Sequence, residues 1–366
     1  MKKSKGLFSY RTRPIITVKR TSGFGMKPSR GSLRGSQVGD SGVVASGNAG
    51  SKEACAKPLP ALRKVEEDSV TSTIYPIDTG KAPQVTAFFD PASNTISYVV
   101  RDPASDACAA IDPVLDFDYA SGRIGFKSAG RIVDFIRENG LKLEWLIETH
   151  AHADHLSAAP YIQEKLGGKI GIGERICEIQ EAFGKIFNEG TEFQRDGSQF
   201  DRLFKDGDTY AIGCFTAFAM HTPGHTPACM THVIGNSAFV GDTLFMPDGG
   251  TARADFPGGD ARQLYRSIKK VLSLPPQMRL FMCHDYGPGQ REIRWETTVA
   301  EERASNIHVR DGIGEDEFVA MRTARDKTLG MPKLIIPSIQ VNMRAGHLPE
   351  PEADGKSFLK VPLNGL

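Results

Sequence analysis

The chain has 366 residues, of which 40% are hydrophobic and 24% are charged, a composition typical of globular proteins. No apolar run approaches the roughly 18 residues that a membrane-spanning helix requires, so we expect no membrane association. Residues 1–39 hold ten Lys or Arg and no acidic residue, which leaves 35 basic against 44 acidic residues in the remainder. That acidic remainder argues against a nucleic-acid-binding surface.

The first 70 residues form a basic N-terminal extension. They are rich in Gly, Ser, Lys and Arg and poor in large apolar residues, which predicts a disordered segment without a packed core. Residues 1–34 also lack acidic residues and lack the continuous apolar stretch of a secretory signal, a composition typical of an organelle transit peptide. We therefore expect a mitochondrial matrix protein. If the extension is instead a disordered tail, or results from a wrongly assigned start codon, we expect a cytoplasmic protein.

Strands and one helix are predicted next. Residues 85–89 and 95–100 have β-branched, partly alternating patterns and are separated by turn-forming residues. Residues 109–114 form a further short apolar run with a proline in it. A helix is then expected, with Ser128 as its N-cap and Gly140 at its end.

A cluster of metal-ligand residues follows a predicted buried strand at residues 143–147. It contains three of the nine histidines of the chain, His150, His152 and His155, together with Asp154. A segment of helical composition, residues 157–166, comes directly afterwards. The cluster is thus expected on a loop at the carboxyl end of a strand, where sheet proteins commonly bind ligands. Imidazoles and carboxylates are common ligands of zinc and iron, so this pattern predicts a metal site.

The pattern His-x-His-x-Asp-His at residues 150–155 resembles the signature of the metallo-β-lactamase superfamily. Three later segments resemble the remaining ligand loops of that superfamily: Thr222–Thr226 with His225, Val240–Leu244 with Asp242, and Cys283–Tyr286 with His284. The resemblance implies an α/β fold of the αββα sandwich type. We expect the catalytic domain at residues 75–320 and a C-terminal lobe, residues 321–366, that packs on this core.

Within that superfamily, residues 89–346 resemble the persulfide dioxygenases, also called sulfur dioxygenases or ETHE-type proteins, and the related bacterial β-lactamase-like hydrolases. The stretches that carry the resemblance include residues 250–256 and 342–344. Ala254 and Gly249 depart from relatives that carry cysteine and tyrosine there. The resemblance implies oxidation of glutathione persulfide by O₂ to sulfite and glutathione, as in sulfide detoxification.

The resemblance also assigns roles to individual residues. One Fe(II) per chain, with Zn as the alternative, would be held by His150, His225 and Asp242. The other motif residues would orient these ligands or hold a second metal: His152, Asp154 and His155. The expected catalytic residues are Tyr286, as a hydrogen-bond donor near the metal, His284 and Arg253. Arg253 is a candidate to bind a glutathione carboxylate, and a surface salt bridge is its alternative.

The main alternative function is that of glyoxalase II, a binuclear hydrolase of glutathione thioesters. All seven of its metal ligands have counterparts here, so the ligands do not separate the two functions. Residues 342–344 resemble the dioxygenases, and the helical glutathione-binding domain of the hydrolase has no visible counterpart. A metal-retaining protein without enzymatic activity is a third possibility, and a homodimer is a possible assembly.

Overall fold

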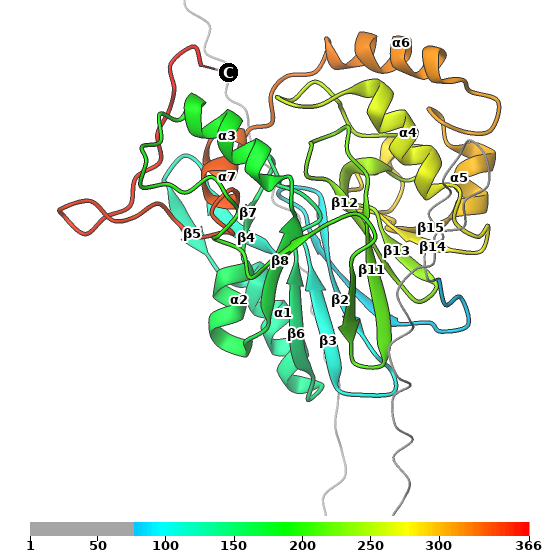
Figure 1. Cartoon of the computed structure of the whole chain (residues 1–366), viewed down its shortest axis with the longest axis horizontal. Coiled ribbons are helices and arrows are strands. Elements are labelled where there is room, and N and C mark those ends of the chain that lie inside the picture. The colour runs from blue at the N-terminus through cyan, green and yellow to red at the C-terminus, as the bar shows by residue number, and fades with distance from the viewer. Residues whose placement is uncertain (1–76, 366) are drawn as a thin grey trace, which may run out of the picture. The chain divides into compact units, whose positions relative to one another are not determined.

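Two six-stranded β-sheets pack face to face, and helices cover the outer face of each (Figure 1). The computed structural model describes residues 77–365, so the predicted N-terminal extension lies outside the described residues and its transit function stays a prediction. The αββα sandwich expected from the sequence is confirmed. No helix in the described part of the chain is long and apolar enough to span a membrane.

The first sheet has the order β1-β2-β3-β6-β8-β9. Its strands are β1 (Gln84–Asp90), β2 (Thr95–Arg101), β3 (Ala107–Ile111), β6 (Lys142–Ile147), β8 (Lys169–Gly173) and β9 (Arg202–Phe204). Strands β3 and β6 are parallel, and Ile111 lies opposite Ile147 at their carboxyl ends. The residues that follow these two strands therefore meet at one edge of the sheet.

The second sheet has the order β10-β11-β12-β13-β14-β15, and a small third sheet has the order β5-β4-β7. The strands of the second sheet are β10 (Thr209–Ile212), β11 (Phe215–His221), β12 (Met230–Ile234), β13 (Ser237–Phe239), β14 (Arg279–Phe281) and β15 (Glu296–Thr298). Those of the third sheet are β4 (Val114–Asp118), β5 (Arg123–Gly125) and β7 (Leu156–Ser157).

Apolar side chains of the two large sheets form a shared central core, and two outer cores lie beneath the helices. One outer face carries α1 (Lys127–Glu138), α2 (Ala159–Leu166), α3 (Ile176–Ile186) and α7 (Ile335–Asn342). The other carries α4 (Ala261–Val271), α5 (Val299–Ser305) and α6 (Glu315–Asp326). Short 3₁₀ turns are η1 (Gly241–Thr243) and η2 (Pro288–Gln290).

The predicted strands at residues 85–89 and 95–100 are confirmed as β1 and β2. The predicted cap of α1 is wrong, because the helix begins at Lys127 and the Ser128 hydroxyl donates to Asp116 Oδ1 at 2.6 Å. Asp116 also accepts the backbone N–H of Ser128, so a neighbouring strand supplies the cap. The strand predicted at 109–114 is broken at Asp112, whose φ of 49° ends β3 and redirects the chain into β4.

The C-terminal segment is interleaved with the catalytic core. Helix α6 crosses the expected boundary at residue 320, and its Phe318 belongs to the same outer core as α4. Helix α7 packs on β7, directly after the metal-ligand motif. The segment after residue 320 is thus part of the structure that holds the site.

Helix α5 contains a buried carboxyl group. Glu302 has no exposed surface, and its Oε2 accepts a hydrogen bond from Asn306 Nδ2 at 2.6 Å. Burial raises the pKa of Glu302 from 4.5 to about 8, because water is excluded from the charged form. The protonated acid is therefore the stable form in the folded protein.

We expect Glu302→Gln to remove a pH dependence of stability. The folded-state pKa is raised, so the protonated acid favours folding fully below pH 4.5, and this contribution is lost as the pH rises toward 8. In the parent protein the free energy of unfolding should fall by at most about 1.4 kcal/mol per pH unit over this range. Urea unfolding at pH 5 and pH 8 measures it. The exposed Glu138→Gln serves as the control, and an unchanged pH dependence in Glu302→Gln contradicts the assignment.

Candidate metal centre

Three buried side chains converge at the carboxyl edge of the two sheets: His150, His225 and Asp242. Their donor atoms all lie within 4.8 Å of one another. His150 follows β6, His225 follows β11, and Asp242 lies on η1 after β13. The three residues that the sequence predicted as primary ligands are therefore brought together by three separate loops.

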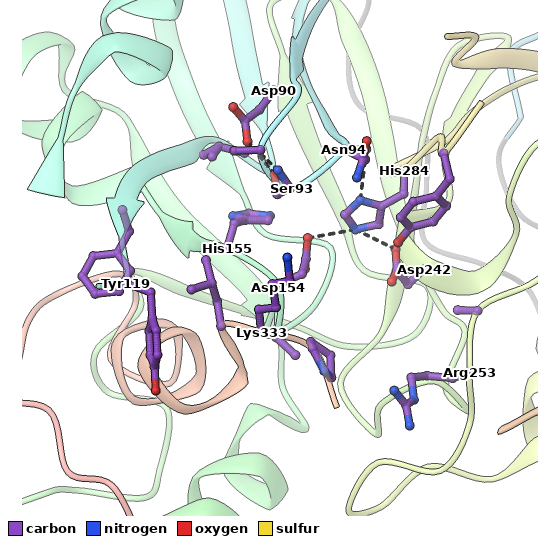
Figure 2. Close-up of a pocket in the computed structure, with 18 of the residues that line it drawn as sticks. Asp90, Ser93, Asn94, Tyr119, Asp154, His155, Asp242, Arg253, His284 and Lys333 are labelled. Atoms are coloured by element: carbon purple, nitrogen blue, oxygen red, sulfur yellow. Dashed lines mark hydrogen bonds and ion pairs between the residues drawn. The ribbon is translucent and has the colours of Figure 1, made fainter. Parts of the chain in front are cut away.

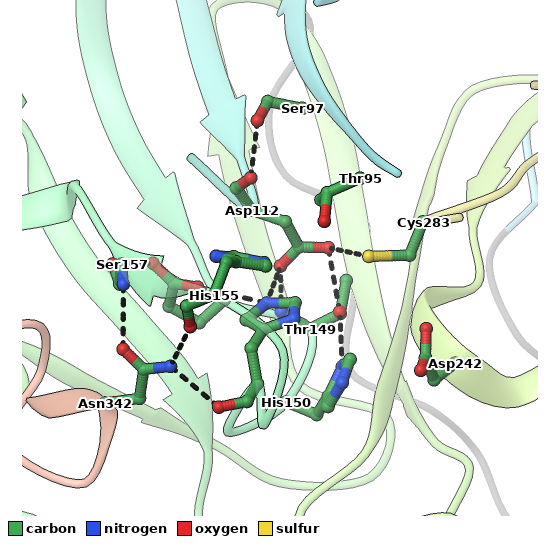
Figure 3. Close-up of polar contacts among 12 residues, drawn as sticks. Thr95, Ser97, Asp112, Thr149, His150, His155, Ser157, Asp242, Cys283 and Asn342 are labelled. Atoms are coloured by element: carbon green, nitrogen blue, oxygen red, sulfur yellow. Dashed lines mark hydrogen bonds and ion pairs between the residues drawn. The ribbon is translucent and has the colours of Figure 1, made fainter. Parts of the chain in front are cut away.

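A hydrogen-bond chain fixes the tautomer of His150 (Figure 3). The Thr149 hydroxyl donates its single proton to Asp112 Oδ2 at 2.9 Å, so it accepts from His150 Nδ1 at 3.0 Å. Burial and the neighbouring histidines lower the pKa of His150 well below its ordinary value. The ring is thus neutral, and Nε2 is free to bind a metal.

The second histidine is oriented in the same way by the backbone. His225 Nδ1 donates to the carbonyl oxygen of Arg253 at 2.8 Å, and its Nε2 lies 3.6 Å from Asp242 Oδ2. Asp242 Oδ1 is buried and accepts no hydrogen bond. Two imidazoles and one carboxylate thus offer close donor atoms to a single point, which is a donor set that suits a divalent metal.

Gly241 permits this close arrangement. Its φ of +53° lies in the left-handed region, and an added Cβ would lie 2.7 Å from Thr149 Oγ1. A larger residue would displace the hydroxyl that orients His150. This glycine is therefore part of the site although it offers no ligand.

His152 points away from the three converging donors. Its Nε2 lies 2.9 Å from Asp112 Oδ1 and 3.3 Å from Glu148 Oε2, all within the protein interior. Burial alone would lower the pKa of His152, but these two carboxylates raise it well above the ordinary value. Its Nδ1 is buried and has no hydrogen-bond partner, so this nitrogen can ligate a metal while Nε2 donates to the carboxylate.

The remaining predicted residues line the same pocket as His225 and Asp242 (Figure 2). His284 Nε2 lies 3.5 Å from Asp154 Oδ2 and 3.4 Å from Asp242 Oδ1. His155 donates through Nδ1 to the carbonyl of Leu156 at 3.1 Å. Among the residues that the structure describes, the close donor groups join Asp154 and His155 to His152 and not to His284. His152, Asp154 and His155 therefore form a second set of three close donors.

The pocket beside these residues has a volume of about 1140 Å³. Tyr286 lies at its mouth, 57% exposed, with its ring stacked on His284 at a centroid distance of 5.9 Å. Arg325 and Lys333 line the same pocket, and neither forms an ion pair with another described residue. The pocket can thus accept a ligand with anionic groups next to the metal ligands.

Arg253 is engaged within the protein. Its guanidinium binds both carboxylate oxygens of Asp255, at 2.6 and 2.8 Å, and donates to the carbonyl of Gly330 at 2.7 Å. It also lies over the Phe256 ring, 4.8 Å from the centroid. Arg253 therefore forms the salt bridge given above as the alternative, and its guanidinium is not free to bind a substrate carboxylate on both of its NH groups.

Two residues of the site were not anticipated from the sequence as parts of it. Asp112 holds both Thr149 and His152, and Asn342 donates to the carbonyls of His152 and His155 at 2.8 Å each. The signal for Asp112 is a carboxylate directly after an apolar strand. The signal for Asn342 is its place in a stretch that resembles persulfide dioxygenases.

Comparison with known proteins agrees with this geometry. The family model described as "Metallo-beta-lactamase superfamily" matches residues 91–284, and the chain belongs to that superfamily. It is an enzyme of that superfamily with a metal-binding site.

Several relatives are similar over most of their length. The chain is 58% identical to a probable metallo-hydrolase of Burkholderia pseudomallei, over 77% of this chain and 99% of that protein. It is 47% identical to glyoxylase B2 of Dictyostelium discoideum, over 77% and 98%. It is 31% identical to the mitochondrial persulfide dioxygenase ETHE1 of Homo sapiens, over 70% and 87%. The crystal structure of ETHE1 from Myxococcus xanthus aligns with a TM-score of 0.58 at 27% identity, over 72% of this chain and 100% of that one.

We expect Asn342→Ala to loosen the metal-ligand loop. The substitution leaves two buried carbonyls and the N–H of Ser157 without partners, at about 1–3 kcal/mol for each unsatisfied group. A loss of at least about 3 kcal/mol in the free energy of unfolding is expected from urea titration. Asn139→Ala, at the exposed end of α1, is the matched control and should cost less than about 0.5 kcal/mol. Similar losses in both variants contradict the role of Asn342.

Proposed function

We propose that this protein is an iron-dependent persulfide dioxygenase that acts on glutathione persulfide. The observation that carries the proposal is the separation of the motif histidines. His150 presents Nε2 to the site shared with His225 and Asp242, whereas His152 falls in other donor groups, with Asp154 and His155 or with Cys283 and His284. Two imidazoles and one carboxylate are the ligand set typical of non-haem Fe(II) oxygenases.

The proposed reaction converts glutathione persulfide, O₂ and water into glutathione, sulfite and two protons. The S–S bond breaks, the outer sulfur is oxidised, and O₂ is reduced. Fe(II), when bound by His150, His225 and Asp242, supplies the redox chemistry for this oxidation. The pocket would hold the persulfide sulfur next to these ligands, so that the encounter with O₂ becomes local.

The cations of the pocket support an acidic thiol as substrate. Glutathione carries two carboxylates and one ammonium group, and Arg325 and Lys333 provide positive charge on the pocket wall. Arg253 would shape this wall through Asp255 and Gly330 rather than bind the substrate with its full guanidinium fork. Burial alone would lower the pKa of His284, but the carboxylates of Asp242 and Asp154 raise it above its ordinary value, so a positive charge there could stabilise a developing anion.

A second candidate is hydrolysis of glutathione thioesters by a binuclear centre. The names of relatives favour it, because the proteins called metallo-hydrolase and glyoxylase are 58% and 47% identical, against 31% for the named dioxygenase. A binuclear centre would draw on His152, whose Nδ1 is buried without a hydrogen-bond partner and which forms donor groups with Asp154 and His155 and with Cys283 and His284. The hydrogen bond between His152 Nε2 and Asp112 Oδ1 would then orient this ligand.

The reaction itself decides between these functions. With Fe(II) loaded, glutathione persulfide should drive O₂ uptake and sulfite release, whereas glutathione alone should not, because it lacks the outer sulfur. Asp242→Ala should abolish turnover, since it removes the only anionic ligand. Asp248→Ala, on an exposed carboxylate of the following loop, is the control and should retain activity. Rapid hydrolysis of lactoylglutathione, without O₂ uptake on the persulfide, would establish the hydrolase instead.

Metal counting gives an independent test. If the centre is mononuclear, His155→Ala should retain about one iron per chain while activity falls roughly 10–100-fold, as for other residues that orient metal ligands. Elemental analysis of protein purified without chelator measures the iron. Two metals per chain in the parent protein, reduced to one by the substitution, would support the binuclear hydrolase.

A further inference from the structure

The loop at residues 250–254 has no helix or strand, yet side chains from α6 and from the turn before it hold its backbone. Arg322 Nη1 donates to the carbonyl of Thr251 at 3.0 Å, and His308 Nδ1 accepts from the Thr251 N–H at 3.1 Å. Asp326 Oδ2 accepts from the N–H of Ala254 at 3.0 Å. A loop that would otherwise be free to move is thus fixed by groups far away in the sequence.

One peptide group in this loop has partners on both sides. The peptide between Arg253 and Ala254 donates its N–H to Asp326 and accepts the Nδ1 proton of His225 on its carbonyl oxygen, at 2.8 Å. Because a peptide is planar, the orientation of its N–H fixes the orientation of its carbonyl. Hydrogen bonds in such a chain polarise one another, so the carboxylate makes the carbonyl a better acceptor.

The carboxylate at the end of this chain is itself held rigidly. Arg322 and Asp326 are one helical turn apart on α6, 1% and 4% exposed, and Arg322 Nε donates to Asp326 Oδ1 at 2.8 Å. One carboxylate oxygen thus binds the arginine and the other binds the loop. A buried ion pair adds little net stability compared with apolar residues, so a role in positioning accounts better for its presence.

We propose that Asp326 is a positioning residue for the metal ligand His225 and acts through the peptide between residues 253 and 254. The negative charge of Asp326 polarises this peptide, which strengthens the hydrogen bond to His225 Nδ1 and makes Nε2 more electron-rich. Metal-bound histidines commonly donate to a carboxylate or a carbonyl in this way. Here the imidazole donates to a carbonyl, and the N–H of the same peptide group donates to a carboxylate. The inference concerns metal binding and holds for either proposed reaction.

The test is metal affinity in the full chain, independent of turnover. Asp326→Asn keeps the shape of the side chain and removes its charge. We expect about tenfold weaker Co(II) binding in chelator competition and a shifted visible spectrum of the Co(II) protein. Glu315→Gln is the matched control: it lies on the same helix and removes contacts to Arg262 and Arg266 on the protein surface without touching the loop. It should leave both readouts unchanged.

A second variant covers the case in which Asp326→Asn does not fold. Arg322→Lys keeps the positive charge but loses the planar fork that orients Asp326, and a smaller loss of Co(II) affinity, about threefold, is expected. Melting of the metal-free proteins reports general destabilisation separately. The proposal is overturned if the folded variants bind Co(II) with parental affinity and spectrum, whatever their melting temperatures.

Discussion

The carboxylate of Asp112 organises the metal-ligand loop. It is 2% exposed, and it accepts from the Thr149 N–H at 2.7 Å, from the Thr149 hydroxyl at 2.9 Å and from His152 Nε2 at 2.9 Å. A buried carboxylate is stable only when such donors surround it. Its place depends on the parallel pairing of β3 and β6, which brings the end of one strand beside the loop that follows the other.

This one interaction gives neighbouring histidines different properties. Asp112 binds His152 directly and keeps it charged, and it binds His150 only through a hydroxyl, which leaves that ring neutral. A pattern of two histidines separated by one residue therefore does not by itself define how many metals are bound. The chemistry depends on which nitrogen of each ring is left without a protein partner.

The sequence predicted the parts of the structure that depend on local pattern. The strands at 85–100 and 143–147 alternate or form short apolar runs, and the ligand loops carry His and Asp at recognisable spacings. The direction of His152 was not predictable, because Asp112 lies 40 residues away in the chain. Helix α7 was also missed: its residues are buried on nearly every side, so no amphipathic pattern marks it, and Pro337 argues locally against a helix.

The two histidine ligands are supported alike from opposite sides of the sandwich. His150 is linked through the Thr149 hydroxyl to Asp112, which follows strand β3 of the first sheet, and His225 is linked through a peptide group to Asp326 of α6. In each case one neutral, polarisable group separates the imidazole from the carboxylate. This keeps the histidine from being protonated by a direct ion pair, as happens at His152, while still fixing its tautomer. The C-terminal helices are thus as much a part of the metal site as the histidine motif.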